Sequence, residues 1–465
     1  MKRTKEDLVQ TAVGIVPSER QLKWQELEFY AFIHFGMNTF TNSELGNGGE
    51  SPKLFNPSKL NAEQWVKIIK AAGMRGLILT AKHHDGFCLW PSEYTEHSVK
   101  NSQWRDGNGD LVMEVSQACK NHGIKFGIYL SPWDKHEPSY GEGEAYNEFY
   151  KNQLKELLTN YGELFCVWID GACGKDEGRK QQYDWQGYFE IIRQLQPEAV
   201  ISICGPDVRW CGNEVGVCRK SEWSVVPSSL YPFKSNEKEK GNIMMLDLGS
   251  RKALGKAKEK ELVWYPAEVN VSIRKGWFYH KSEDITLKPL SKLMEIYYNS
   301  VGANANMLLN VPPNDDGLIP DRDAETLISM GAQLEFDFNE NLAEDSEMTG
   351  SGCLDNEHCP QMVLTDSLDD YWHSGNNPDN PWIILDMGDD YDIDKVVLRE
   401  HIRTGQQIEK FSLYGEIGGK WKNLFKGTVI GGKRICRFKE VRVQRIKLVI
   451  EQTRCFATIS SFEAY

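Results

Sequence analysis

The alternation of apolar runs with helical segments over the first two-thirds of the chain is the feature that most restricts its fold. Runs such as Leu77–Leu79 and Val167–Ile169 are apolar on consecutive residues, which is typical of strands buried on both faces. Between the runs, Asn61 has the position of a helix cap, and Gly123 and Gly162 each follow a predicted helix. Strands that alternate with helices form parallel sheets, so this region predicts repeated βα units.

Eight such runs lie between Phe29 and Val311, and they fit an α/β fold, a (β/α)8-like barrel with insertions. The helices between the fifth and seventh runs are the least distinct. The predicted strands are Phe29–Phe35, Arg75–His83, Lys125–Ser131, Leu164–Ile169, Ala199–Cys204, Glu222–Val226, Trp264–Ser272 and Ala305–Val311.

The pattern changes near Asn341. Residues 341–355 are polar and contain glycine, which is typical of a linker, and the short runs after them alternate without a helical period. A single core stops growing near roughly 250–300 residues, so a chain of 465 residues is expected to hold two domains. We predict the barrel over residues 1–345 and an all-β sandwich over residues 346–465.

Charge and hydropathy exclude several classes of partner. The net charge is −13 and no run is rich in Lys or Arg, which argues against a nucleic-acid partner. The sequence contains no stretch of about 18 apolar residues, so no membrane span is expected. The charged start, Met1–Asp7, is not followed by an apolar segment, so no signal peptide is expected. The chain as written therefore predicts a cytoplasmic protein; a processed mature form would be periplasmic or secreted. The oligomeric state is not predicted.

The 11 cysteines are odd in number and contain no C-x-x-C pair, which argues against a zinc ribbon or a thioredoxin-like site. Free thiols in a reducing compartment are expected. A Cys353–Cys359 disulfide is the alternative.

Polar and aromatic side chains follow most of the predicted strands, and in a barrel the active site forms at the carboxyl ends of the strands. Aromatic faces stack on sugar rings, and a pair of carboxylates can perform displacement and proton transfer, so this rim predicts a glycosidase. The residues are His34, Asn38, Lys82, His83, His84, Asp85, Tyr129, Trp133, Asp134, Asp170, Asp207, Arg209, Glu222, Trp223, Glu268, Arg274, Trp277 and Asn310.

Two of these positions have alternative roles. Asp170 could cap a helix after its strand, although the small residues that follow it would let a ligand approach closely. His83 and His84 could bind a metal or make structural hydrogen bonds. Adjacent residues on a strand point to opposite faces, however, so both could reach one ion only at a strand end.

Four blocks of sequence resemble the retaining α-L-fucosidase family, glycoside hydrolase family 29. They are Phe32–Phe40, Thr80–Trp90, Val167–Gly171 and Met307–Pro313. The resemblance covers about residues 15–335 and implies hydrolysis of terminal α-L-fucose with retention, without a metal or organic cofactor, on a fucosylated oligosaccharide or glycoconjugate.

The resemblance also implies roles for individual residues. Asp170 matches the family's nucleophile, while His34, His83 and His84 match residues of its fucose pocket. Tyr129 and Trp277 correspond more loosely to an aromatic pair of that pocket.

The acid/base residue varies within the family. The segment Trp210–Gly216 resembles the branch that prefers α-1,3 and α-1,4 linkages in Lewis-type glycans, which implies Glu214 as acid/base, with Glu222 as its rival. A Glu-Trp-Gly of the family reads Glu44-Leu45-Gly46 here, so an aromatic contact is missing, but Glu44 is retained as a candidate ligand of a hydroxyl group.

The C-terminal region resembles discoidin-like (coagulation factor 5/8 type C) sandwiches, through Trp372–Gly375, Trp382–Gly388 and Arg442–Ile450. Such a domain would either bind carbohydrate or pack on the barrel as a structural unit. The alternatives to a fucosidase are another barrel exo-glycosidase, such as an α-galactosidase, and a non-catalytic sugar-binding protein.

Overall fold

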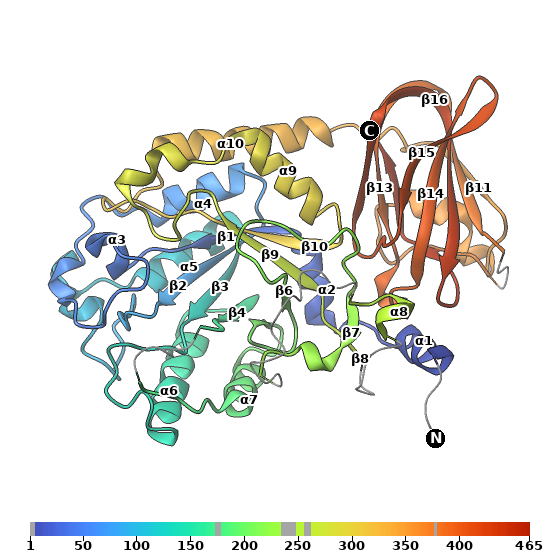
Figure 1. Cartoon of the computed structure of the whole chain (residues 1–465). Coiled ribbons are helices and arrows are strands. Elements are labelled where there is room, and N and C mark those ends of the chain that lie inside the picture. The colour runs from blue at the N-terminus through green and yellow to red at the C-terminus, as the bar shows by residue number, and fades with distance from the viewer. Residues whose placement is uncertain (1–4, 173–177, 234–247, 255–261, 376–378) are drawn as a thin grey trace.

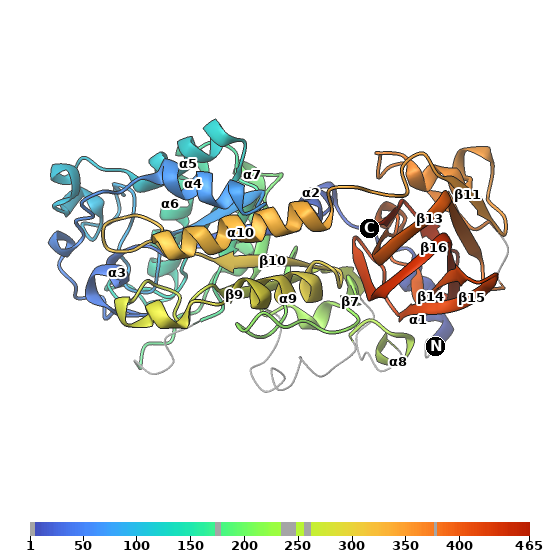
Figure 2. The ribbon, with the colours of Figure 1, turned by 90° about the horizontal axis from the view of Figure 1, so that it is seen from above.

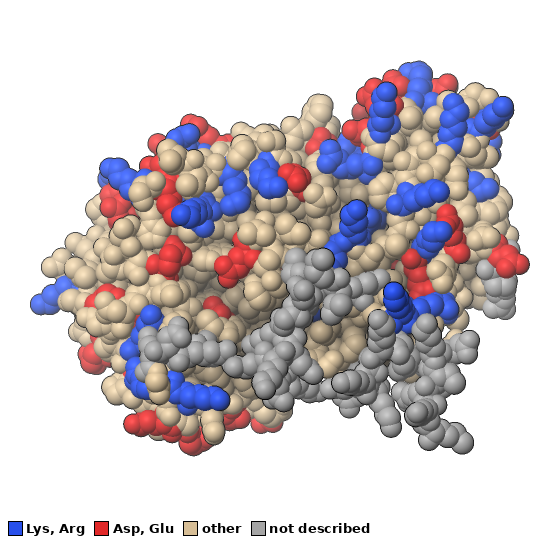
Figure 3. Space-filling view, viewed as in Figure 1, with Lys and Arg blue, Asp and Glu red and all other residues tan. Residues whose placement is uncertain are grey.

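The computed structural model describes residues 5–172, 178–233, 248–254, 262–375 and 379–465. A barrel and a sandwich lie side by side in it (Figures 1 and 2). Both signs of charge are scattered over the face shown in Figure 3. Within the described ranges, no helix has the length and apolar character needed to cross a membrane.

Eight parallel strands form the barrel wall, in the order β5-β4-β3-β2-β1-β10-β9-β6. A parallel bridge between Ser202 of β5 and Val208, next to β6, brings the two edges together, so the barrel is nearly closed. The strands are β1 Phe29–Ile33, β2 Gly76–Lys82, β3 Lys125–Leu130, β4 Cys166–Ile169, β5 Val200–Ile203, β6 Arg209–Trp210, β9 Ala267–Ser272 and β10 Ala305–Asn310.

Helices cover the outside of this wall (Figure 1). Two of the predicted helix caps are confirmed. The Asn61 side chain accepts the Gln64 N–H before α4, and Gly123 ends α5 with a left-handed φ of 69°. In the described ranges the helices are α1 Lys5–Val13, α2 Glu19–Leu27, α3 Met37–Thr41, α4 Ala62–Ala71, α5 Leu111–His122, α6 Glu144–Asn160, α7 Trp185–Leu195, α8 Arg251–Leu254, α9 Leu290–Ser300 and α10 Asp321–Asp337. Of these, α1 and α8 lie beside the sandwich and not on the barrel wall (Figures 1 and 2).

The sixth barrel strand differs from the prediction. We expected it at Glu222–Val226, but β6 is the two-residue strand Arg209–Trp210, which pairs with β9. The apolar part of the predicted segment forms β7 (Val225–Pro227), which pairs antiparallel with β8 (Leu262–Trp264) outside the barrel. A strand of two residues has too little apolar pattern to be read from sequence.

The C-terminal region forms the expected antiparallel sandwich. The long β13 carries an irregularity between Asp386 and Tyr391, and the predicted linker contains a short edge strand, β11. The strands are β11 Glu347–Gly350, β12 Trp372–His373, β13 Trp382–Arg399, β14 Ile408–Ile417, β15 Lys420–Gly427, β16 Arg434–Thr453, β17 Thr458–Ile459 and β18 Ser461–Ala464.

Glu28, just before β1, joins the two domains through a buried charge cluster. Its carboxylate pairs with Arg399 over 2.6 Å and with Lys433 over 2.8 Å, both from the sandwich. Burial would raise the pKa of Glu28, but the two cations outweigh it and hold that pKa at about 2. Removing one member would leave an uncompensated buried charge, so this contact fixes the sandwich against the barrel.

Candidate active site

A cavity of about 870 Å³ opens among the side chains that follow the barrel strands. All eight of the site residues predicted from the sequence line it, whereas Glu222 does not. The eight are His34, Glu44, His83, His84, Tyr129, Asp170, Glu214 and Trp277.

Asp170 directly follows β4, and its carboxylate accepts two hydrogen bonds. The Tyr129 hydroxyl donates to Oδ2 over 3.0 Å, and the Ala172 N–H donates to Oδ1 over 2.7 Å. His84 Nε2 lies 3.8 Å from Oδ2, which is too long for a direct hydrogen bond. The carboxylate is thus held in one orientation at the cavity wall. Its alternative role as a helix cap falls on residues 173–177, outside the described residues.

His34 follows β1, and its hydrogen bonds define its tautomer. The amide nitrogen of Asn310 donates to Ser272 Oγ and to the Trp277 carbonyl, so Asn310 Oδ1 is the acceptor that faces His34 Nδ1 at 2.8 Å. His34 therefore carries its proton on Nδ1 and presents an acceptor at Nε2. Burial lowers its pKa to about 3, so the ring is neutral at ordinary pH.

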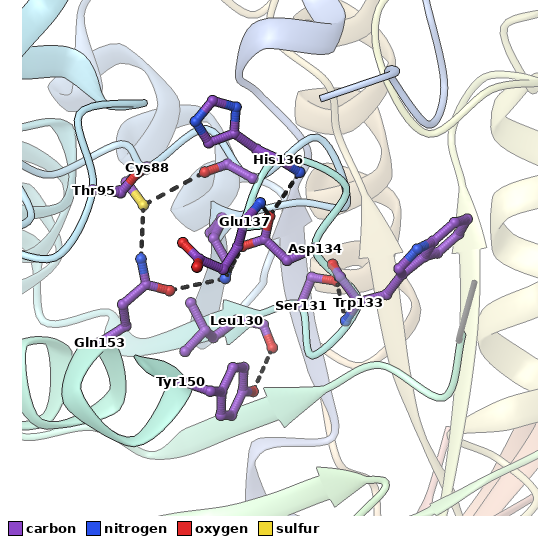
Figure 4. Close-up of polar contacts among 12 residues, drawn as sticks. Cys88, Thr95, Leu130, Ser131, Trp133, Asp134, His136, Glu137, Tyr150 and Gln153 are labelled. Carbon is purple, nitrogen blue, oxygen red and sulfur yellow. Dashed lines mark hydrogen bonds and ion pairs between the residues drawn. The ribbon is translucent and has the colours of Figure 1, made fainter. Parts of the chain in front are cut away.

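His84 is fixed in the same way. Its Nδ1 lies 2.7 Å from Ser131 Oγ, and that hydroxyl donates to the Trp133 carbonyl (Figure 4), so Nδ1 donates and Nε2 is left as an acceptor on the side of Asp170. Beside it, the His83 ring stacks on Tyr129 at 5.6 Å between centroids. Burial lowers the pKa of both histidines. Neutral imidazoles of this kind recognise hydroxyl groups without attracting a counter-ion.

The neighbours of this histidine pair are structural. Lys82 is fully buried and pairs with Asp134 over 2.7 Å, and Asp134 also accepts the N–H groups of His136 and Glu137 (Figure 4). This closed network holds the turn after β2 against the turn after β3. It therefore orients the two histidines but does not itself reach the cavity.

Glu44 and Trp277 also line the cavity, next to His34. Glu44 Oε2 accepts the Trp277 N–H over 2.9 Å, and Oε1 accepts from His280 Nε2 over 2.6 Å. The Trp277 indole N–H in turn donates to Glu214 Oε2 over 3.2 Å. Leu45, which stands where the resemblance led us to expect an aromatic residue, lines the cavity with 46% of its surface exposed.

Glu214 lies on an exposed loop that follows β6. Asn213 closes the loop on itself: Oδ1 accepts the N–H groups of Val215 and Val217, and Nδ2 donates to the Val217 carbonyl over 2.6 Å. Residues 213–217 therefore form a compact turn that presents the Glu214 carboxylate to the cavity.

Glu222, the rival acid/base residue, is buried away from the cavity. Its carboxylate pairs with Arg209 over 2.8 Å and with Arg219 over 2.9 Å. Burial would raise the pKa of Glu222, but the two guanidinium groups outweigh it and hold the pKa below its usual value. A buried, paired carboxylate is suited to holding a loop and not to donating a proton to substrate.

Glu268, one of the predicted rim residues, does not line the cavity. Two residues that do line it were not predicted as site residues. Glu268 is fully buried below the cavity, where Trp168 donates to it over 2.8 Å. The missed residues are Trp210, 37% exposed, and Asn270, whose Oδ1 accepts the Trp210 indole N–H over 2.9 Å. Asn270 lies two residues after Glu268 on the same strand face, so the alternation of β9 was a usable signal.

Fold and site together define a class: a glycoside hydrolase with its site at the strand ends of a parallel barrel. In the described part of the chain, no group of three His, Cys, Asp or Glu residues could hold a metal ion. The same residues include Cys353 and Cys359 as free thiols, which corrects the alternative of a disulfide between them.

Comparison with known proteins identifies the family. Residues 18–338 match the α-L-fucosidase family model, and residues 347–463 match that of the F5/8 type C domain. The chain belongs to the α-L-fucosidase family and is an α-L-fucosidase with a C-terminal F5/8 type C domain. This replaces the alternatives of an α-galactosidase and of a non-catalytic sugar-binding protein.

Three similar proteins illustrate the match. Alpha-L-fucosidase 1 of Arabidopsis thaliana is 44% identical over 97% of this chain and 87% of that protein. The crystal structure of a candidate α-L-fucosidase from Bacteroides ovatus is 42% identical with a TM-score of 0.89, covering 100% of this chain and 76% of that one. A Ruminococcus gnavus family 29 fucosidase in complex with fucose is 33% identical with a TM-score of 0.85, covering 97% and 95%.

Proposed function

We propose that this fucosidase acts by double displacement with retention, with Asp170 as nucleophile and Glu214 as acid/base. Asp170 attacks the anomeric carbon while Glu214 protonates the departing glycosidic oxygen; water, deprotonated by Glu214, then releases fucose. The observation that carries the proposal is the pair of carboxylates on one cavity, one held by Tyr129 and the other by Trp277.

The histidines supply the recognition of fucose in this proposal. Nε2 of His34 and of His84 accept hydrogen bonds from sugar hydroxyl groups, and His83 completes the same wall. Burial lowers the pKa of all three rings, which favours the neutral forms that accept these hydrogen bonds.

We further propose that the natural substrates carry α-1,3- or α-1,4-linked fucose in Lewis-type glycans. The proposal is supported by the resemblance of Trp210–Gly216 to the branch with that preference. It is also supported by the exposed face of Trp210 at the cavity, which can stack on a second sugar of a branched glycan.

The test is incubation with a fucosylated Lewis trisaccharide and, separately, with a 2′-fucosylated trisaccharide. Release of fucose from the Lewis substrate at least about tenfold faster, in kcat/KM, supports the linkage preference. Equal rates, or faster cleavage of the 2′-linkage, would contradict it. Proton NMR during the first minutes tests the mechanism, since retention requires that α-fucose appear before the β-anomer.

A further inference from the structure

The loop that carries Glu214 is held at both ends, and the second end lies against the sandwich. At its start, β6 pairs with β9, and the Cys211 N–H donates to the Glu268 carbonyl over 3.0 Å. At its end, residues 220–222 meet the sandwich domain where β16 begins, near β7 (Figure 1). The loop therefore bridges the barrel wall and the C-terminal domain.

Two sandwich side chains contact this loop end directly. Arg434 Nη1 donates to the Lys220 carbonyl over 3.1 Å, and the Thr428 and Ser221 hydroxyls share a short hydrogen bond. Each bond is exposed and contributes little alone. Together they tie consecutive residues of the loop to the sandwich.

A third, buried connection runs through Asn304, which lies between α9 and β10. Its Nδ2 donates to the Glu222 carbonyl over 2.7 Å, and its Oδ1 accepts the Gly432 N–H over 2.8 Å. The Asn304 N–H also donates to the Lys433 carbonyl over 3.1 Å. The start of β16 thus extends along the residues before β10, and the same asparagine holds the loop.

The segment between residues 220–222 and Glu214 is short and internally bonded. Asn213 makes residues 213–217 one compact turn, and the Arg219 N–H donates to Glu222 Oε1 over 2.9 Å, so little slack lies between that turn and Glu222. The Cys218 thiol, which donates to the Asn299 carbonyl of α9 over 2.8 Å, is a further anchor of the same segment. The acid must lie within hydrogen-bond reach of the departing oxygen, so its rate contribution is sensitive to small displacements.

We infer that the sandwich acts as a positioning element for the acid/base residue, with Thr428, Arg434 and the Asn304–Gly432 connection holding the loop that presents Glu214. This inference rests on the proposed role of Glu214. It gives the C-terminal domain a part in the chemistry of the barrel that does not require the domain to bind sugar.

The experiment uses the full chain with Thr428→Val and Arg434→Met combined. Valine keeps the shape of threonine, and methionine keeps much of the arginine stem, so chiefly the polar contacts are lost. The readout is kcat/KM on a series of aryl α-L-fucosides whose phenols differ in acidity. We expect the poorest leaving group to be cleaved about tenfold more slowly and the best at the parent rate. This slope does not depend on the fraction of folded enzyme.

Two further variants complete the design. Arg403→Met breaks a different contact between the domains, the 2.7 Å pair with Glu19 of α2, and should leave the slope unchanged. Asn304→Gly, which tolerates the left-handed φ of 66°, removes the buried connection and should steepen the slope even if the double variant folds poorly.

The outcomes separate the two hypotheses. If Glu214→Ala steepens the slope but neither the double variant nor Asn304→Gly does, the positioning inference is wrong and the proposed function stands. A uniform loss across all leaving groups in those variants overturns the inference as well, because it indicates general damage to the barrel. If Glu214→Ala itself leaves the slope unchanged, the assignment of the acid/base residue is wrong.

Discussion

The two carboxylates of the cavity are held in different ways. Asp170 follows a barrel strand and is fixed by Tyr129 from the neighbouring strand and by a backbone N–H of its own turn. Glu214 lies on an exposed loop and is fixed by Trp277. The far end of that loop depends on a buried carboxylate, Glu222, and on the second domain.

This difference matches the demands of the two roles. A nucleophile must meet the same atom of every substrate, so a rigid position inside the barrel suits it. An acid must meet the oxygen between fucose and a variable leaving sugar, and a loop at the rim can be shaped for that sugar without disturbing the barrel. In the proposed mechanism, specificity for the leaving group and its protonation thus depend on the same loop.

The largest expected effect comes from changing Asp170, the carboxylate held inside the barrel. Asp170→Ala should lower kcat by about 10⁴-fold or more on every substrate, because the covalent step is lost whatever the leaving group. Kinetics with aryl fucosides and with a trisaccharide measure the loss, and thermal unfolding should show a folded protein. Activity retained on any of these substrates would remove Asp170 from the mechanism.

Changing Glu214, the carboxylate on the loop, should have a smaller effect that depends on the leaving group. Glu214→Ala should lower kcat/KM for glycans by about a thousandfold. It should leave kcat/KM for aryl fucosides with the best leaving groups nearly unchanged, since those phenolates depart without a proton. Azide should restore turnover by replacing the deprotonated water in the second step.

Glu222→Gln is the matched control for this variant. It weakens the pairs with Arg209 and Arg219, so it should lower the temperature of unfolding more than Glu214→Ala does. Azide rescue of the Glu222 variant, and not of the Glu214 variant, would exchange the two assignments.

Tyr129→Phe tests how much the hydrogen bond to Asp170 contributes to the proposed attack. The change removes the 3.0 Å hydrogen bond to Asp170 and keeps the ring that stacks on His83. A hydrogen bond to a charged group contributes about 1.5–3 kcal/mol, so kcat should fall roughly ten- to a hundredfold with a smaller change in KM. The loss should be similar for good and poor leaving groups; a loss confined to poor ones would place Tyr129 with the acid.

The surroundings of Asp170 were easier to predict from the sequence than those of the Glu214 loop, for a physical reason. Strands such as Val167–Ile169 are buried on both faces, so their apolar runs mark where Asp170 must emerge. The role of Glu222 depends on Arg209, and β6, which carries Arg209, is too short to show a pattern. The contacts of Asn304 and Arg434 join segments far apart in the chain, and no local pattern records them.

The interior below the nucleophile gives the smallest predicted effect on activity. Glu268 accepts hydrogen bonds from Tyr30 and from Trp168, which lies two residues before Asp170, and burial raises the pKa of Glu268 to about 7. The folded protein therefore keeps a proton that the unfolded chain loses above its ordinary pKa of 4.5, so this residue costs stability as the pH rises from 4.5 to 7.

Glu268→Gln removes that titration. The free energy of unfolding of the variant, relative to the parent, should rise by up to about 3 kcal/mol between pH 4.5 and 7, as measured by urea unfolding at several pH values. The dependence of kcat/KM on the leaving group should stay unchanged, because the substitution alters only the side chain, which contacts Tyr30 and Trp168, and keeps the backbone carbonyl that accepts the Cys211 N–H. A flat difference in stability across that range would show that Glu268 is ionised in the folded protein. A changed leaving-group dependence would show instead that the two sides of the cavity are coupled through the barrel interior, where the Cys211 N–H bonds to the Glu268 carbonyl.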